Sequence, residues 1–338
     1  MHTPRPDILP QQSLQLSARE RTERRISDEN RRLAKLLLAC RGYVILKDAV
    51  PDHYVESLRA EFDEIFADCQ ATADLDETAA DADALHQVRV SARKGASFWF
   101  RKSRWRIFPR LAGPIADPYL LANPFAVPIL EDLLGDDFYC KYLTSDTCVN
   151  GAILQSPHSD VDMGDVFVEN HWRARGYVVN VPIMECGLHN GPIEVWPGGS
   201  HLWTSRLLEQ YGLSPYVQDG RNPAVEQLAQ YFPSIKVAIG PGDVLIRDLG
   251  MWHRGTPNPT DEPRTMMTLG YFRRDYAYGY GDPSFNLDRN LYERLHPRIQ
   301  RMFDYHFSLK SVLRRKQRQL RSKARAVAAG WVKGRLGR

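Results

Sequence analysis

The chain has 338 residues, of which 43% are hydrophobic and 25% are charged. This composition is close to the average of soluble globular proteins, which argues against a disordered chain and allows one large domain or two ordinary ones. The net charge of +4 is uneven, because residues 310–338 hold eleven of the 45 Lys and Arg residues and no Asp or Glu. The remainder has 34 basic and 41 acidic residues, so the mildly acidic body gives no indication of a nucleic-acid partner.

Three other classes of protein are disfavoured. The five cysteines are scattered without a CxxC pair, which argues against a disulfide framework or a zinc site and favours free buried thiols in a reducing compartment. The N-terminal residues lack the apolar region of a signal peptide. No run of about 18 apolar residues could form a transmembrane helix. We therefore expect a cytoplasmic protein.

The first half of the chain predicts helices around one strand. Residues 1–15 are polar and contain proline, which predicts a loose N-terminal arm. Residues 17–40 are rich in Arg, Glu, Leu and Ala and predict a helix that ends before a glycine. The apolar run at residues 43–46 has the β-branched and aromatic content of a strand, and Pro51 then begins a second helix.

From about residue 138 onward, short strand-like runs alternate with turns rich in glycine and proline. This pattern predicts a sandwich or barrel, because helices do not alternate with the strands. We interpret residues 16–307 as a single catalytic domain with a helical N-terminal part and a β core at about 138–275. Residues 308–338 are interpreted as a basic helical extension.

The His158-Ser159-Asp160 segment is a candidate metal site. On an extended backbone, residues i and i+2 point to the same face, so both side chains could reach one metal ion. His253 follows 95 residues after His158, beyond a predicted strand. Two histidines and one carboxylate are the ligands of non-haem Fe(II) oxygenases, in which the other coordination positions stay open. The alternative is that the first pair lies in a surface turn.

Arg264 strengthens this interpretation. It stands eleven residues after His253, at the start of a strand-like run. A dicarboxylate co-substrate that chelates iron at one end needs a cation for its far carboxylate, and the planar fork of arginine suits that task. Thr256, between the two residues, could add a hydroxyl. The alternative for Arg264 is a surface ion pair.

Several segments also follow one another in a known order: GYVIL at residues 42–46, HSD at 158–160, NGPIEVWPGGSH at 190–201, GD at 242–243, WHRG at 252–255 and PR at 263–264. Together they resemble the phytanoyl-CoA dioxygenase family of Fe(II)- and 2-oxoglutarate-dependent enzymes over about residues 42–275. The sequence departs from the usual family pattern at Arg254, which separates His253 from Gly255, and at the extra glycine of the PGGSH segment.

The resemblance implies a mainly β fold with flanking helices and a double-stranded β-helix core of the jelly-roll or cupin type. It implies Fe(II) as the metal, with 2-oxoglutarate and O2 as co-substrates, and assigns His253 and Arg264 to the second histidine ligand and the co-substrate arginine. It also suggests that Gln155 binds 2-oxoglutarate, although this side chain could instead face solvent. Because the carboxylate ligand Asp160 is present, hydroxylation or a related oxidation is favoured over halogenation.

Substrate contacts are harder to assign from sequence. Candidates follow the HSD segment or lie on neighbouring strands, and core packing is the alternative for each aromatic residue. They are Tyr142, Asp162, Met163, His171, Trp172 and Asn180. The segment 93–110 interleaves basic and aromatic residues and could bind an anionic substrate, although a solvated face is the favoured interpretation.

The function predicted from the sequence is oxidation of an unactivated C–H bond in a small molecule of secondary or lipid-related metabolism, with release of succinate and CO2, and hydroxylation is the favoured form of this oxidation. The alternatives are a cupin-like metal isomerase or hydrolase, and a non-enzymatic binding protein of the same fold. The basic tail could contact a membrane surface, and a solvated helix is the favoured alternative. The substrate, the oxidised position and the oligomeric state stay open.

Overall fold

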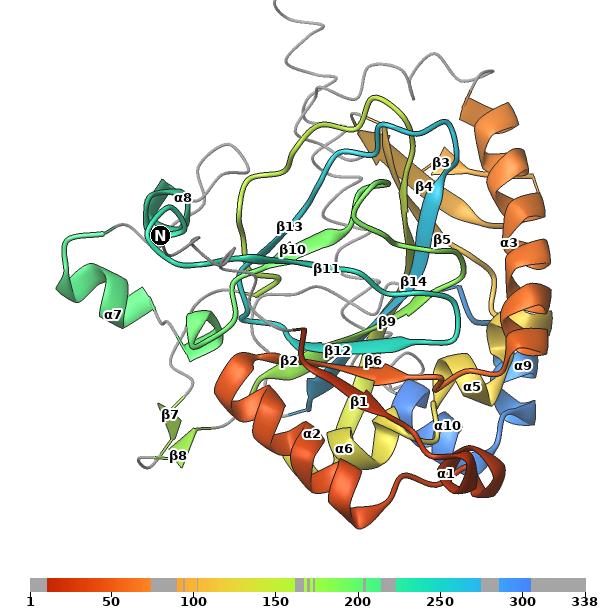
Figure 1. Ribbon diagram of the computed structural model, residues 1–338. Coiled ribbons are helices and arrows are strands. Elements are labelled where there is room, and N and C mark those ends of the chain that lie inside the picture. The colour runs from red at the N-terminus through yellow and green to blue at the C-terminus, as the bar shows by residue number, and fades with distance from the viewer. Residues whose placement is uncertain are drawn as a thin grey trace, which may run out of the picture.

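The computed structural model describes the following residues: 11–73, 90–93, 95–101, 103–161, 167–168, 171–172, 174–202, 205–213, 223–274 and 286–304. Two β-sheets face each other at the centre of the molecule (Figure 1). The basic tail at 308–338 and most of the N-terminal arm lie outside the described residues.

The large sheet has the strand order β1-β2-β12-β9-β14-β6-β5-β4-β3, and its pairs are antiparallel except β1 with β2. Its strands are β1 (Ser13–Gln15), β2 (Tyr43–Lys47), β3 (Val90–Ser91), β4 (Ser97–Arg101), β5 (Arg104–Phe108), β6 (Phe138–Cys148), β9 (Gly176–Pro182), β12 (Val244–Asp248) and β14 (Arg264–Arg273). The small sheet consists of β11 (Ile235–Val237), β10 (Ile193–Val195) and β13 (His253–Gly255). A separate pair joins β7 (Phe167–Val168) to β8 (His171–Trp172).

Both faces of the large sheet are buried, because its side chains alternate between two apolar layers. On the inner face, Ile45, Leu245 and Met266 pack against Val195 and Val237 of the small sheet. The outer face packs against helices through the alternate residues of the same strands, which include Val44, Val179, Ile246, Met267 and Leu269. Two facing sheets that pack apolar side chains between them form a double-stranded β-helix, which confirms the predicted fold class.

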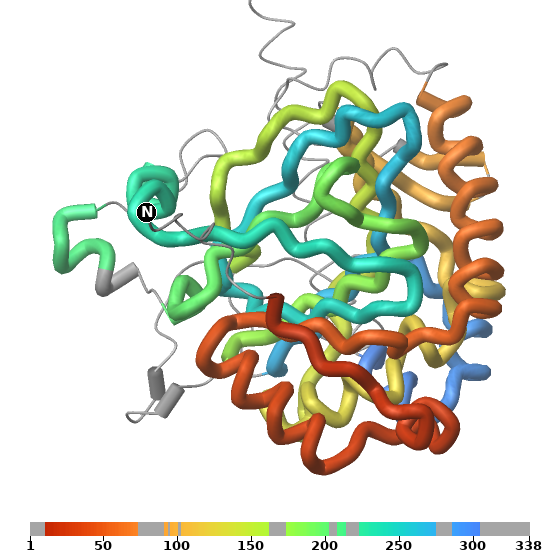
Figure 2. The backbone as a smooth tube through the Cα atoms, viewed as in Figure 1, coloured from red at the N-terminus to blue at the C-terminus, as the bar shows by residue number. Residues whose placement is uncertain are grey.

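Helices cover the outer face of the large sheet. In Figure 2, α3 runs along one side of the molecule and α2 lies beneath β2. The covering elements are α1 (Ala18–Glu23), α2 (Asp28–Arg41), α3 (Asp52–Ala73), η1 (Gly113–Ala116), α5 (Pro118–Leu121), α6 (Ala126–Leu134), α9 (Arg289–Arg294) and α10 (Pro297–Phe303). The remaining elements are η2 (Ser200–Leu202), α7 (Ser205–Gln210) and α8 (Pro223–Leu228). Among the described residues, no helix has both the length and the apolar character to cross a membrane.

The N-terminal region differs from its prediction in two ways. Residues 13–15 are not loose but form β1, since the carbonyl of Gln12 accepts a hydrogen bond from the N–H of Ile45 (2.8 Å) and the register continues along β2. The single helix expected at 17–40 is two helices, because Arg24 adopts a left-handed conformation (φ 50°) and Ser27 caps α2. The five cysteines are free, as predicted, although Cys40 is exposed rather than buried.

Glu20 connects the two N-terminal helices. Its carboxylate accepts hydrogen bonds from the backbone N–H groups of Ser17 (2.8 Å) and Ser27 (2.8 Å) and from Nδ2 of Asn30 (3.0 Å). Burial alone would raise the pKa of Glu20, but these hydrogen bonds lower it to about 2. The folded-state pKa is thus below the unfolded value of about 4.3. The carboxylate therefore contributes stability that is present above pH 4.3 and is lost as the pH falls towards 2.

We expect Glu20→Gln to lower the free energy of unfolding at pH 7 by about 1–3 kcal/mol, because a neutral amide accepts these hydrogen bonds less well. The deficit should shrink as the pH is lowered from about 4.3 towards 2. Urea unfolding at several pH values measures both effects. The control is Glu23→Gln, which removes an exposed carboxylate paired with Arg19 and should change little. Equal stabilities of the Glu20 and Glu23 variants at pH 7 would contradict the assignment.

Candidate active site

Backbone pairing brings the three candidate metal ligands together at one end of the inner space. The N–H of His158 donates to the carbonyl of His253 (3.0 Å), and the N–H of His253 donates back to the carbonyl of His158 (2.9 Å). On either side of this pair, Gln155 N–H donates to Gly255 (3.1 Å) and Asp160 N–H donates to Leu249 (2.9 Å). The segment before β7 is thereby fixed against the turn between β12 and β13.

The side chains of the triad converge. Candidate donor atoms of His158, Asp160 and His253 all lie within 4.8 Å of one another. The Nδ1 atom of His158 lies 2.8 Å from the Ser156 carbonyl, and that of His253 lies 3.0 Å from the Met251 carbonyl. Because a carbonyl can only accept, each Nδ1 carries the proton and each Nε2 keeps its lone pair for a metal. Two imidazoles and a carboxylate suit Fe(II).

Arg247 on β12 controls the charge of this cluster. Its Nη2 lies 2.6 Å from Oδ2 of Asp160, and its Nη1 lies 3.4 Å from Nδ1 of His253. Burial alone would raise the pKa of Asp160, but the positive charge of Arg247 holds that pKa well below its usual range. Burial and Arg247 lower the pKa of His253 to about 3. The carboxylate is therefore ionised and His253 is neutral near pH 7, which are the protonation states that bind metal.

Arg264, at the start of β14, is only 1% exposed. Its Nη1 contacts Oδ2 of Asp146 at 3.2 Å, while its Nε and Nη2 atoms have no hydrogen-bond partner among the described residues. Buried donors without partners are uncommon in folded proteins, and two on one guanidinium fit a carboxylate ligand. The side chain of Asp146 is 40% exposed although it points between the sheets, so the inner space is open beside Arg264.

Arg104 on β5 is a second buried cation beside Arg264. Both residues pair in register with Cys148, from the two sides of β6. The Nη2 atom of Arg104 donates to the carbonyls of Thr256 (2.7 Å) and Ile153 (3.2 Å), and its Nε has no partner among the described residues. Burial alone would raise the pKa of Asp146, but Arg264 and Arg104 lower it, so this carboxylate is ionised between two arginines.

Gln155 and Thr256, the two further residues predicted to bind 2-oxoglutarate, differ in whether a side-chain hydrogen-bond donor is left for it. The side-chain carbonyl of Gln155 accepts a hydrogen bond from the N–H of Gly255 (2.7 Å), which leaves its amide NH2 as a donor. Thr256 does not match its predicted role. Its hydroxyl donates to the carbonyl of Pro192 (2.6 Å), so it has no hydrogen left for a carboxylate.

Two predicted substrate residues lie on the inner face of the large sheet. The ring of Tyr142 covers Gly270, where a Cβ atom would approach its Cε1 to 2.3 Å. Asn180 donates from Nδ2 to Oγ1 of Thr268 (2.9 Å), and its Oδ1 has no partner among the described residues. Asp162 and Met163 lie outside the described residues, as do the side chains of His171 and Trp172 on β8.

Two charged residues of the inner face, Asp146 and Arg247, were not predicted as site residues. Arg104 and Arg106 belong to segment 93–110, for which a solvated face was favoured over an anion site, and both lie on the inner face instead. The alternation of arginine with Trp105 and Ile107 on β5 does signal two different faces, but it favours a solvated polar face over a buried one. Arg247 was the other available signal, because it stands within the apolar run of β12. A buried charge is rarely left unpaired, so this arginine indicates a buried carboxylate partner.

Arg254 does not disturb the position of His253. On β13, His253 and Gly255 share one face and Arg254 takes the other, because strand side chains alternate. Its Nε pairs with Oε2 of Glu194 at 2.6 Å, and its guanidinium carbon lies 5.2 Å from the ring centre of Trp196. The residue that departs from the family pattern therefore belongs to the outside of the small sheet.

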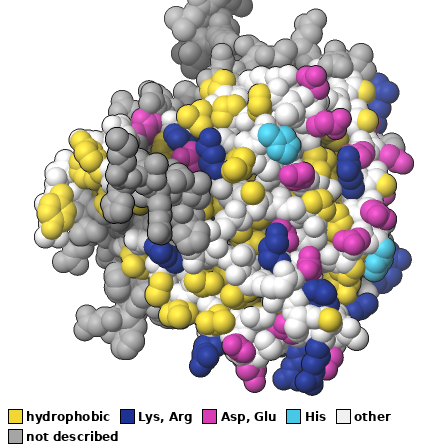
Figure 3. Space-filling view, viewed as in Figure 1, with side chains coloured by type: hydrophobic (Ala, Val, Ile, Leu, Met, Phe, Trp, Pro, Cys, Tyr) yellow, Lys and Arg dark blue, Asp and Glu magenta, His cyan; other side chains and the backbone are white. Residues whose placement is uncertain are grey.

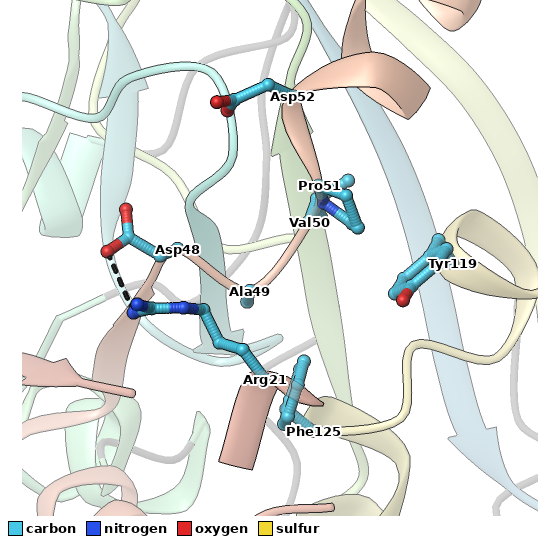
Figure 4. Close-up of a pocket in the computed structure, with 8 residues that line it drawn as sticks. All are labelled: Arg21, Asp48, Ala49, Val50, Pro51, Asp52, Tyr119 and Phe125. Carbon is cyan, nitrogen blue, oxygen red and sulfur yellow. Dashed lines mark hydrogen bonds and ion pairs between the residues drawn. The ribbon is translucent and has the colours of Figure 1, made fainter. Parts of the chain in front are cut away.

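A surface hollow on the helical side is a second concave feature (Figure 4). Its lining includes Arg21, Asp48 and Phe125, and Arg21 pairs with Asp48 at 3.3 Å. Asp48 follows β2 at the end opposite Tyr43, which pairs with Arg247 near the triad. Because Asp48 lies at that opposite end of β2, the hollow is separate from the candidate site.

On the face shown in Figure 3, acidic and basic side chains are interspersed.

A double-stranded β-helix that brings together two histidines and one carboxylate is typical of the non-haem iron oxygenases. Residues 38–266 match the phytanoyl-CoA dioxygenase (PhyH) family. Since this match covers more than half of the chain, the protein belongs to the phytanoyl-CoA dioxygenase family, and it is an enzyme of the 2-oxoglutarate-dependent dioxygenase kind.

Two solved structures are reported as similar to this chain. The epimerase SnoN, in complex with Fe3+, alpha ketoglutarate and nogalamycin RO, matches with a TM-score of 0.52 and 16% identity over 73% of this chain and 84% of that chain. EctD from S. alaskensis, with 2-oxoglutarate and 5-hydroxyectoine, matches with a TM-score of 0.49 and 21% identity over 81% of this chain and 83% of that chain. At these identities the SnoN match supports the fold alone.

Proposed function

We propose that this enzyme uses Fe(II), 2-oxoglutarate and O2 to hydroxylate an unactivated C–H bond of a small molecule, with release of succinate and CO2. His158, Asp160 and His253 hold the iron, and Arg264 anchors the co-substrate. One observation carries this proposal. Three side chains that can bind a metal converge between the two sheets, and the buried guanidinium of Arg264, on the inner face of the large sheet, has two N–H donors without hydrogen-bond partners among the described residues.

The triad residues have their donor atoms oriented before metal binds. The carbonyls of Ser156 and Met251 hold the two Nδ1 protons, which directs the Nε2 atoms of His158 and His253 to the metal. Arg247 holds Oδ2 of Asp160, while Oδ1 lies 3.6 Å from Nε2 of His253. Arg247 is thus a positioning residue that leaves Oδ1 as the metal ligand. When bound, the iron would supply the redox chemistry that activates O2.

Arg264 and Arg104 together suit the far carboxylate of 2-oxoglutarate. Arg264 offers Nε and Nη2, and Arg104 offers Nε, so charge-assisted hydrogen bonds can come from both sides of Cys148. The amide NH2 of Gln155 is a further donor on the triad side. The carboxylate of Asp160 occupies a ligand position that a halide would need, which favours hydroxylation over halogenation.

A cupin-like isomerase or hydrolase could use the same metal ligands, but neither reaction needs a buried arginine for a dicarboxylate. A binding experiment distinguishes these functions without a known substrate. Fe(II)-loaded protein is mixed anaerobically with 2-oxoglutarate, and the visible charge-transfer absorption of a chelated keto acid is recorded. The band should form at stoichiometric 2-oxoglutarate and should be absent with succinate, which lacks the keto group. A Fe(II)-loaded protein that gives no band would contradict the proposal.

A further inference from the structure

Among the described residues, the inner space around the triad has more positive than negative side chains. Two of its arginines form ion pairs, each with one carboxylate: Arg247 with Asp160 at 2.6 Å and Arg264 with Asp146 at 3.2 Å. Two further arginines come from β5, on the face opposite the side chains that pack in the helix-covered core. These four arginines and two carboxylates are Arg104, Arg106, Arg247, Arg264, Asp146 and Asp160.

Arg106 is the arginine of this group without a polar partner. Within the described part of the chain it forms no ion pair and no hydrogen bond, whereas Arg104 donates to two carbonyls. Its guanidinium carbon lies 5.2 Å from the ring centre of Tyr142 and 6.0 Å from that of Trp99, its neighbour across the β4–β5 ladder. Aromatic faces leave the in-plane N–H groups of a guanidinium unused, and these groups suit a carboxylate or phosphate.

Arg106 lies on the triad side of the inner space through its contact with Tyr142. Burial, together with the nearby carboxylate of Asp160, raises the pKa of the Tyr142 hydroxyl, while Arg106 and Arg247 oppose that shift. All four residues are therefore close enough to interact. Arg106 also helps to lower the pKa of Asp146, which pairs with Arg264. A group bound at Arg106 would therefore lie between the Tyr142 side of the inner space and Arg264.

The net charge of the described side chains in the inner space also favours an anionic substrate. On the proposed function, Fe(II) and doubly charged 2-oxoglutarate cancel each other, which leaves the excess of two positive charges among the four arginines and two carboxylates. Excess charge in a partly buried space is unfavourable unless it is compensated. We propose that the substrate carries an anionic group, a carboxylate or a phosphate, that binds Arg106 between the rings of Tyr142 and Trp99. This inference rests on the proposed function.

The test compares matched probes on the anaerobic Fe(II)–2-oxoglutarate protein by calorimetry. The anionic probes are 3-phenylpropionate and phenyl phosphate, and the neutral probes are 3-phenylpropionamide and phenol. At least one anion should bind about tenfold more tightly than its neutral partner, as charge-assisted hydrogen bonds require. The anion that shows the larger preference identifies the group as carboxylate or phosphate.

Arg106→Gln should remove this preference and Arg106→Lys should keep part of it, with thermal unfolding confirming that both fold. The matched control is Arg110→Gln, which removes the same charge from an exposed residue paired with Asp288 (3.0 Å) and should leave the preference intact. An absent preference in the wild type, or one that survives in Arg106→Gln, would overturn the proposal. So would a loss of 2-oxoglutarate affinity in Arg106→Gln as large as that in Arg264→Gln.

The charge-transfer band separates this inference from the proposed function. If the band never forms, the proposed function fails, and the probes are then titrated into the protein without 2-oxoglutarate. An Arg106-dependent preference for anions in that state would still support an anion site at Arg106. Loss of the preference with the band intact would overturn the anion site and leave the proposed function standing.

Discussion

Asp160→Ala is expected to abolish iron-dependent turnover of 2-oxoglutarate. The substitution removes a metal ligand, and it also leaves Arg247 as an uncompensated cation, since its Nη2 lies 2.6 Å from Oδ2 of Asp160 in the native protein. Removing one partner of a buried ion pair destabilises a folded protein by about 3–5 kcal/mol. The loss of a direct ligand beside an uncompensated cation should in addition lower metal affinity by about 100-fold or more. Equilibrium titration with Fe(II) or Co(II) measures this loss, and succinate formation measures turnover.

A second substitution tests the electrostatic part of this argument. In Asp160→Ala/Arg247→Met the repelling cation is gone, so the double variant should bind metal more tightly than Asp160→Ala alone, by about tenfold or more. Arg247→Met alone should weaken metal binding by about 10- to 100-fold, because Asp160 loses the group that orients it. Wild-type turnover in Asp160→Ala would remove Asp160 from the ligand set.

Arg264→Gln is expected to raise the KM for 2-oxoglutarate by about 100-fold or more, because two charge-assisted hydrogen bonds are lost at a buried position. Metal affinity should stay within a fewfold of the wild type, since Arg264 contacts Asp146 rather than a triad residue. Steady-state kinetics with varied 2-oxoglutarate and a separate metal titration measure the two effects.

Arg254→Gln is the matched control for Arg264→Gln. It removes an equal charge from the outside of the small sheet, where Arg254 pairs with Glu194 at 2.6 Å, and it should leave the KM for 2-oxoglutarate almost unchanged. An unchanged KM in Arg264→Gln, or equal effects of the two substitutions, would show that the co-substrate carboxylate binds elsewhere.

The sequence was most informative where a local pattern has one physical solution. Short apolar runs separated by Gly and Pro turns can bury both faces only by pairing into facing sheets, which is what β9, β12 and β14 do. The i, i+2 spacing of His158 and Asp160 placed both side chains on one face, and the structure brings His253 beside them by mutual backbone hydrogen bonds with His158.

The charges of the inner space could not be placed from sequence. Alternation on β5 shows that Arg104 and Arg106 share a face, but a polar face is ordinarily solvated, and only the pairing of β5 with β6 turns it inwards. The link between Arg247 and Asp160 joins residues 87 positions apart, for which the local pattern carries no signal. Thr256 had suitable chemistry at a suitable spacing, but the carbonyl of Pro192 already occupies its hydroxyl hydrogen.

The N-terminal region also differs from its prediction because contacts between residues distant in the sequence decide its structure. β1 has only three residues, and its pairing with β2 depends on a strand about thirty positions away, which composition does not reveal. The break between α1 and α2 depends on Arg24 in a left-handed conformation and on the contacts of the Glu20 carboxylate, whereas the amino-acid content of the segment favours an uninterrupted helix.

Succinate formation from 2-oxoglutarate tests the central claim most directly. Protein loaded anaerobically with Fe(II) is mixed with 2-oxoglutarate and then with O2, in the wild type and in His253→Ala. We predict slow succinate release by the wild type even without the substrate, and none above background in His253→Ala, whose triad has lost one ligand. Equal succinate formation by the two proteins, or none by a wild type that holds Fe(II), would contradict the assignment of the triad as the iron centre of a dioxygenase.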